Sequence, residues 1–300
     1  MPPNSTALIL HRVKYFGHTV ELVHRNYAAL TEMVSYVLGS PAPRHILDTT
    51  DAWLRHDMLK ELTFRLHDYL AAVKSLVDHS RRLYKKLYKD RGLFPEYEPE
   101  VRRVFATNGI VQTVQCLREM AQHYQLPSIV LIRRATSDDE TSTRVILRRD
   151  DLLKFDGWNS HARRFISTGG EEIDLRDLCE RHHSIVVEFY RWMSESLAQI
   201  HASELEAYNA DQLANFLKFL PDMLRSVESK VQFLERTGIS DLPWAFGQLL
   251  SQAERRRLHG IAQNTAEWAE SALAAVSSRA ELPAELVARI RLLARRQDSG

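Results

Sequence analysis

The chain has 300 residues, 44% of them hydrophobic, which is enough to bury the core of one large domain or two smaller ones. Its 40 basic and 39 acidic residues give a net charge of +1, so nucleic acid or acidic lipid would have to bind a local patch. No segment approaches the ~20 apolar residues of a membrane-spanning helix, and the first residues lack a signal-peptide pattern. We therefore expect a cytoplasmic protein without membrane attachment. Its two cysteines, Cys116 and Cys179, show no paired spacing and are expected to be reduced thiols.

Helical periodicity dominates the first 125 residues. A first helix is predicted over residues 7–38, before a stretch rich in Gly and Pro. A second runs from Thr50 or Asp51 to Asp90, because its apolar side chains recur every three or four positions. A third is expected over residues 99–124, kinked or divided at Asn108-Gly109.

The pattern changes after residue 126. Two short β-type runs, residues 129–132 and 144–147, flank a polar stretch at 136–141 and predict a β-hairpin at about 128–148. Two strands alone are marginally stable, so we expect the hairpin to pack on the helices or on a partner.

Helical patterns then return and continue to the C-terminus. A long helix is predicted over residues 174–208, after two short helical segments at 151–155 and 158–166. Shorter helices follow, punctuated by proline and glycine, over residues 212–220, 222–236, 244–258, 263–278 and 282–296. The expected fold is mainly α: an N-terminal helix (1–49), a helical bundle with the hairpin inserted (50–208) and a C-terminal helical region (209–300).

The end of the third predicted helix carries the residues that best indicate chemistry. Arg118 and His123 lie five positions apart, followed by Pro127. A permanent cation beside a group that exchanges protons near neutral pH can cleave RNA without a metal. Arg118 would hold a phosphate and His123 would do the proton transfer, while Glu119 could accept a hydrogen bond from His123. An exposed Arg/Glu/His cluster is also commonplace on helices that have no catalytic role.

A second candidate is the basic end of the second predicted helix. Its cations could contact RNA phosphates while Tyr84 or Tyr88 stacks on a base. The structural alternative is that basic residues complement the helix dipole and that Tyr84 belongs to the apolar stripe. The basic residues concerned are Arg81, Arg82, Lys85, Lys86 and Lys89.

Metal and cofactor motifs are not recognisable. His182 and His183 are adjacent and point in different directions, while His11, His18 and His24 are spaced too widely or turned too far to share one ion. The sequence also lacks the glycine-rich and nucleophile motifs of nucleotide hydrolases, dinucleotide-binding proteins and α/β-hydrolases. We therefore expect no cofactor and no metal site.

The Arg118/His123 arrangement resembles the HEPN superfamily of helical-bundle proteins, and the order of the motifs is similar to a group of bacterial HEPN-like proteins. The similarity runs from the segments 65–70 and 76–81 to Arg118, His123 and Leu126-Pro127, followed by a hairpin, and covers roughly residues 50–205. The family signature is an arginine, usually followed by a polar residue, with four to six residues between the arginine and a histidine. Arg118 and His123 match it with four residues between them, and Glu119 fills the polar position. The resemblance implies a homodimer that brings two such motifs into one cleft as a metal-independent endoribonuclease. Many family members are instead catalytically silent binding modules.

The residues after Arg118 differ from those of the similar bacterial HEPN-like proteins, and the difference bears on activity. They often carry Asn-Tyr after the arginine, whereas this chain has Glu119-Met120, and a carboxylate there can neutralise the arginine and repel phosphate. Three hypotheses follow. The first is an RNA-directed endoribonuclease with a role in defence or a toxin–antitoxin pair, whose partner would be an antitoxin. The second is a silent helical scaffold that binds another protein, and the third is RNA binding without cleavage.

Overall fold

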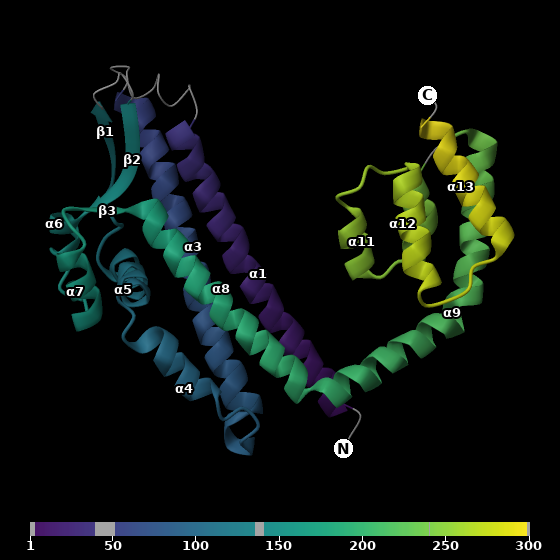
Figure 1. Ribbon diagram of the computed structural model, residues 1–300, viewed down its shortest axis with the longest axis horizontal. Helices are drawn as coiled ribbons and strands as arrows, with labels where there is room; N and C mark the ends of the chain where they lie inside the picture. Colours follow the sequence, from purple (N-terminus) through teal and green to yellow (C-terminus); the bar gives the residue numbers. More distant parts are fainter. Residues whose placement is uncertain (1–3, 40–51, 136–140, 240, 299–300) are drawn as a thin grey trace. The chain divides into compact units, whose positions relative to one another are not determined.

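The computed structural model describes residues 4–39, 52–135, 141–239 and 241–298 (Figure 1). The fold is mainly α with a small antiparallel sheet, as the sequence predicts. The chain divides into two compact units, Met1–Ala202 and Ser203–Gly300. None of the helices within these described ranges is long and apolar enough to cross a membrane.

Three long helices form the frame of the first unit: α1 (Asn4–Gly39), α3 (Ala52–Leu87) and α8 (Leu175–Ile200). Helices α1 and α3 lie side by side, and α8 packs on both (Figure 1). The predicted apolar stripe of α3 is confirmed except at its first member, Leu59, which is only partly buried. The other members are at most 7% exposed: Leu62, Leu66, Tyr69, Val73, Leu76, Leu83 and Leu87. Helix α3 ends three residues before the predicted limit and continues into the 3₁₀ turn η1 (Lys89–Arg91).

A ladder of buried polar contacts joins α3 and its extension to α8 and the residue after it. Tyr69 Oη lies 2.7 Å from His182 Nδ1, Ser80 Oγ lies 3.2 Å from Tyr190 Oη, and Tyr88 Oη lies 2.9 Å from His201 Nε2. Residue numbers rise together on both sides, so the two helices run parallel. Each rung pairs groups that would be costly to bury alone, and the ladder therefore fixes the helix register.

The third predicted helix is divided, as Asn108-Gly109 allows. It consists of α4 (Tyr97–Val101), the π-helical segment η2 (Arg102–Ala106) and α5 (Gly109–His123). Asn108 Oδ1 caps α5 by accepting hydrogen bonds from the backbone N–H groups of Ile110 (3.1 Å) and Val111 (3.3 Å). A Cβ at Gly109 would lie 3.0 Å from Phe165 Cβ, so glycine permits close packing there.

The predicted hairpin is present as β1 (Ile129–Ala135) and β2 (Thr141–Arg148), with Ile129 opposite Leu147. Its expected polar loop lies largely in residues 136–140, outside the described residues. A third strand, β3 (Glu172–Asp174), pairs with the other edge of β2, where Arg144 bonds Glu172 and Asp174. The sequence does not reveal β3, because three residues are too few to show an alternating pattern.

The remaining segments of the first unit are α6 (Arg149–Leu152) and α7 (Ser160–Thr168), which packs on α5. The prediction that one helix spans residues 174–208 is wrong at its C-terminal end. Helix α8 stops at Ile200, and α9 (Ala202–Thr237) begins after His201. Residue 208, where the sequence suggests a boundary, therefore lies inside α9.

The second unit has its own core. It contains most of α9 together with α10 (Leu242–Phe246), the turn η3 (Gly247–Leu249), α11 (Gln252–Leu258), α12 (Ala266–Ser277) and α13 (Ala284–Asp298). The prediction that Pro221 separates two helices is wrong, because α9 continues through it. Proline removes one backbone donor, but the preceding turn is exposed, so water can satisfy the carbonyl that loses its partner.

Candidate nucleic-acid interface

Arg118 and His123 occupy different surroundings on α5. Arg118 lines a cavity of about 110 Å³ together with Lys74 and Arg81 of α3, and its guanidinium donates hydrogen bonds of 3.2 and 2.8 Å to Gln122 Oε1. His123 is exposed in the last helical turn and makes no hydrogen bond or ion pair with any described residue. Five positions place the two side chains about 140° apart around an ideal helix. Arg118 therefore lies beside α3, while His123 faces solvent.

Glu119 lines the same cavity as Arg118 and is exposed. Within the described part of the chain it forms no ion pair with Arg118, whose guanidinium is engaged by Gln122 instead. The carboxylate nevertheless contributes negative charge to the cavity wall.

Three of the five basic residues predicted to bind RNA line one groove, and the other two, Lys86 and Lys89, do not. Arg81, Arg82 and Lys85 line a groove of about 410 Å³ between the end of α3 and α4, where Arg102 of η2 joins them. Lys86 is exposed but does not line the groove, and Lys89 donates a hydrogen bond of 2.8 Å to Glu98. The helical period explains the division, because residues 81, 82 and 85 share a face and residue 86 turns away from it.

The carboxylates of this groove are already compensated. Asp78 accepts a 2.6 Å hydrogen bond from Lys74, and Glu98 is held by Lys89, which lowers the pKa of the Glu98 carboxyl below its usual value. By contrast, the described residues provide no hydrogen-bond or ion-pair partner for the side chains of Arg81, Arg82, Lys85 and Arg102. The groove therefore keeps four cations available for an anionic ligand.

The tyrosines of the segment do not serve as an open stacking platform. Tyr84 is 8% exposed and stacks on Tyr97 with ring centroids 4.2 Å apart, while Tyr88 is 1% exposed. The interpretation that Tyr88 stacks on a base is therefore wrong. Tyr84 lines the groove but belongs to the core stripe, as the structural alternative predicts, and Tyr97 covers one face of its ring. The groove offers contacts to phosphate more readily than to the faces of bases.

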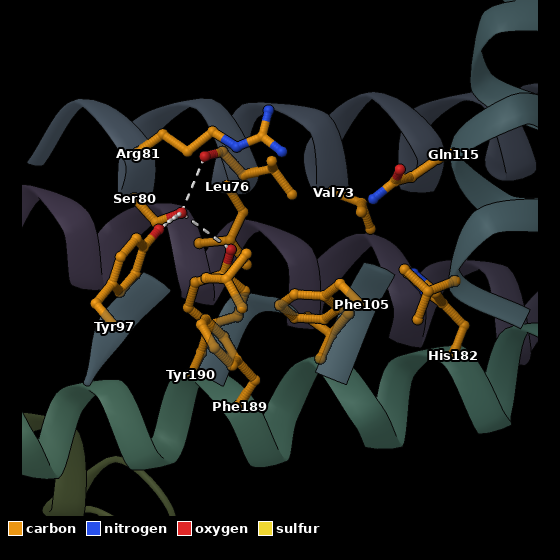
Figure 2. A pocket seen from close by; sticks show the side chains of 14 residues that line it. Val73, Leu76, Ser80, Arg81, Tyr97, Phe105, Gln115, His182, Phe189 and Tyr190 are labelled. Carbon is orange, nitrogen blue, oxygen red and sulfur yellow. Dashed lines mark hydrogen bonds between the residues drawn. The ribbon is translucent and has the colours of Figure 1, made fainter. Parts of the chain in front are cut away.

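Arg81 connects this groove to two neighbouring cavities. It lines the groove, the Arg118 cavity and an inner cavity of about 40 Å³ between α3, η2, α5 and α8 (Figure 2). Beside it, Tyr97 Oη donates a 3.4 Å hydrogen bond to Ser80 Oγ, which lies 3.2 Å from Tyr190 Oη. Sequence reasoning missed Arg102, Tyr97 and Tyr190 as parts of this site, because only the packing of separate helices brings them to α3.

The adjacent histidines have separate roles. His182 is 1% exposed, and burial lowers its pKa to about 3, so the ring is neutral at physiological pH. The ring of His183 stacks on that of Tyr27, with centroids 3.7 Å apart, and makes an edge contact with that of His24, with centroids 5.1 Å apart. Burial lowers the pKa of His183 to about 4. Across the described ranges, no group of three or more His, Cys, Asp or Glu side chains is placed to hold a metal ion.

Both cysteines are buried and unpaired. Burial raises the pKa of Cys179 to about 12 and also raises that of Cys116, which keeps both as unreactive thiols.

Comparison of the chain with family models, curated proteins and solved structures found no match.

Proposed function

We propose that this protein is HEPN-like and binds RNA in the groove formed by Arg81, Arg82, Lys85 and Arg102. The observation that carries the proposal is that these four cations face one groove whose carboxylates are neutralised by other lysines. Phosphate contacts supply most of the affinity of sequence-independent RNA binding, and four unpaired cations suit that task.

Cleavage is a second candidate function, favoured by the position of Arg118. The Arg118 cavity adjoins the groove through Arg81, so an RNA strand bound to the groove can bring a phosphate to Arg118. His123 would then act as general acid or base from the second copy of a homodimer, because it points away from Arg118 within one copy. A cytoplasmic role in defence or as the toxin of a toxin–antitoxin pair would follow from such activity.

The binding proposal is tested by measuring the affinity of a labelled single-stranded RNA over a range of salt concentrations. For the double variant Arg82→Ala/Lys85→Ala we expect weaker binding, and a slope of log affinity against log salt reduced by about 1.4, since each single-strand phosphate contact contributes about 0.7. Arg164→Ala removes an exposed cation from α7, outside the groove, and is the matched control. It should bind like the parent.

Equal affinity and equal salt slope in the parent and the double variant would refute the groove. If the parent protein bound no RNA at all, the protein-binding scaffold would become the leading hypothesis, with an antitoxin or other protein as the partner to be sought.

A further inference from the structure

The inner cavity has polar groups at both ends and an apolar middle (Figure 2). Arg81 lies at one end, beside the hydrogen-bonded hydroxyl groups of Ser80, Tyr97 and Tyr190. His182 and Gln115 lie at the other end. Its middle is lined by aliphatic and aromatic side chains, among them Val73, Leu76, Phe105 and Phe189. A volume of about 40 Å³ holds roughly three water molecules, which together occupy about the volume of one six-membered ring.

His182 has an unused hydrogen-bonding atom in the wall of this cavity. Its Nδ1 is bonded to Tyr69 Oη at 2.7 Å, and Tyr69 is fully buried with no other hydrogen bond to a described residue. The arrangement that uses both groups has the tyrosine hydroxyl donating to Nδ1, which places the imidazole proton on Nε2. The described residues provide no acceptor for that proton, and Nε2 is not among their fully buried atoms that lack a partner, so it retains accessible surface. Since His182 lines the cavity, a ligand with an acceptor can bind this nitrogen.

Gln115 supplies a second polar group at the same end. It is half-buried, its amide has no partner among the described side chains, and it lines both the inner cavity and the Arg118 cavity. An amide both donates and accepts, so Gln115 and His182 together can bind the edge of a heteroaromatic ring. Phe105, which also lines the cavity, belongs to the π-helical segment η2, and such segments are frequent at functional sites.

We propose that the inner cavity holds one pyrimidine base of the RNA bound in the basic groove, with the base edge at His182 and Gln115 and its phosphate at Arg81. The inference rests on the proposed RNA binding and adds a base preference to it. A ring carbonyl of uracil or cytosine would accept the His182 Nε2 proton. A purine carries a second fused ring, for which the cavity has no space.

The test compares binding of three oligomers of equal length: oligouridylate, oligoadenylate and an abasic ribose-phosphate chain. Oligouridylate should bind about tenfold more tightly than the other two. His182→Leu and Gln115→Leu should each abolish that preference while leaving the salt-dependent affinity for the abasic chain unchanged. Gln125→Leu changes an exposed amide just beyond α5 and is the matched control for Gln115. Because His182 is buried, the half-buried Gln115 provides an independent result if His182→Leu does not fold.

The two proposals fail in different ways. Equal binding of all three oligomers by the parent, with sensitivity to Arg82→Ala/Lys85→Ala retained, would overturn the base site and leave the RNA groove standing. No salt-sensitive binding of any oligomer would overturn both. Binding of free uridine 5′-monophosphate without binding of any oligomer would assign the cavity to a free nucleotide and overturn RNA as the source.

Discussion

Lys89 Nζ lies 2.8 Å from Glu98 Oε1, so a lysine expected to contact phosphate instead compensates a carboxylate that lines the groove. The hydrogen bond raises the pKa of Lys89 and lowers that of Glu98, and both groups are charged at neutral pH. The contribution of Lys89 to RNA binding is therefore indirect.

The first prediction separates this indirect role from a direct one. Lys89→Ala should weaken RNA binding about threefold, because it leaves the Glu98 charge in the groove uncompensated. Lys89→Ala/Glu98→Gln should restore the parent affinity, since neither charge then remains. Fluorescence anisotropy measures both, and a double variant as weak as the single one would show that Lys89 contacts phosphate itself.

The second prediction concerns cleavage. If the protein cuts RNA, Arg118→Ala and His123→Ala should each lower the rate by about 10²-fold or more in the presence of a chelator, because each removes a separate catalytic contribution. Circular dichroism would establish that both variants keep their helices. Cleavage by either variant at the parent rate would remove the pair from consideration.

A third prediction follows from the buried, neutral His182. Its pKa is about 3 in the folded protein and 6.5 when unperturbed, so the unfolded chain binds the proton more readily. The stability that depends on neutral His182 is complete above pH 6.5 and falls by about 1.4 kcal/mol for each pH unit below it, until pH about 3. Urea denaturation of the parent and of His182→Leu at pH 7 and pH 5 measures the difference. The parent should lose more stability than the variant, and equal losses would contradict burial of the neutral ring.

The fourth prediction concerns the cap that starts α5. Asn108→Ala should lower the free energy of unfolding by about 1 kcal/mol, because the N–H groups of Ile110 and Val111 lose their acceptor. Asn108→Gly should lower the free energy of unfolding by only about a few tenths of a kcal/mol, since glycine readily adopts the backbone conformation of an N-cap residue. Thermal or urea unfolding compares the two, and an Asn108→Ala variant as stable as the parent would show that the cap contributes nothing.

Much of the fold was predictable because long amphipathic helices repeat their pattern many times. The α3 stripe extends over seven turns, so its buried face is evident from sequence, and the hairpin shows two clear β-type runs. Strand β3 has a single buried apolar residue, Ile173, and is defined by its pairing with β2 rather than by its own pattern. Pro221 misleads because its effect depends on whether the preceding turn is exposed.

The site was predictable only where it lies on one helix. Arg81, Arg82 and Lys85 share a face of α3 and could be predicted as a group. Arg102 joins them from η2, about twenty residues later, and Lys89 leaves the group because Glu98 happens to face it. Such pairings depend on how the helices pack against one another, and the periodic pattern of a single helix does not reveal these contacts.

The polar ladder between α3 and α8 also sets a length scale. Sliding one helix by a single turn would separate Tyr69 from His182, Ser80 from Tyr190 and Tyr88 from His201 together, leaving six buried groups without their present partners. The ladder therefore fixes the backbone positions of His182 and Arg81 relative to each other. Any molecule that reaches both is selected for its length as well as for its chemistry.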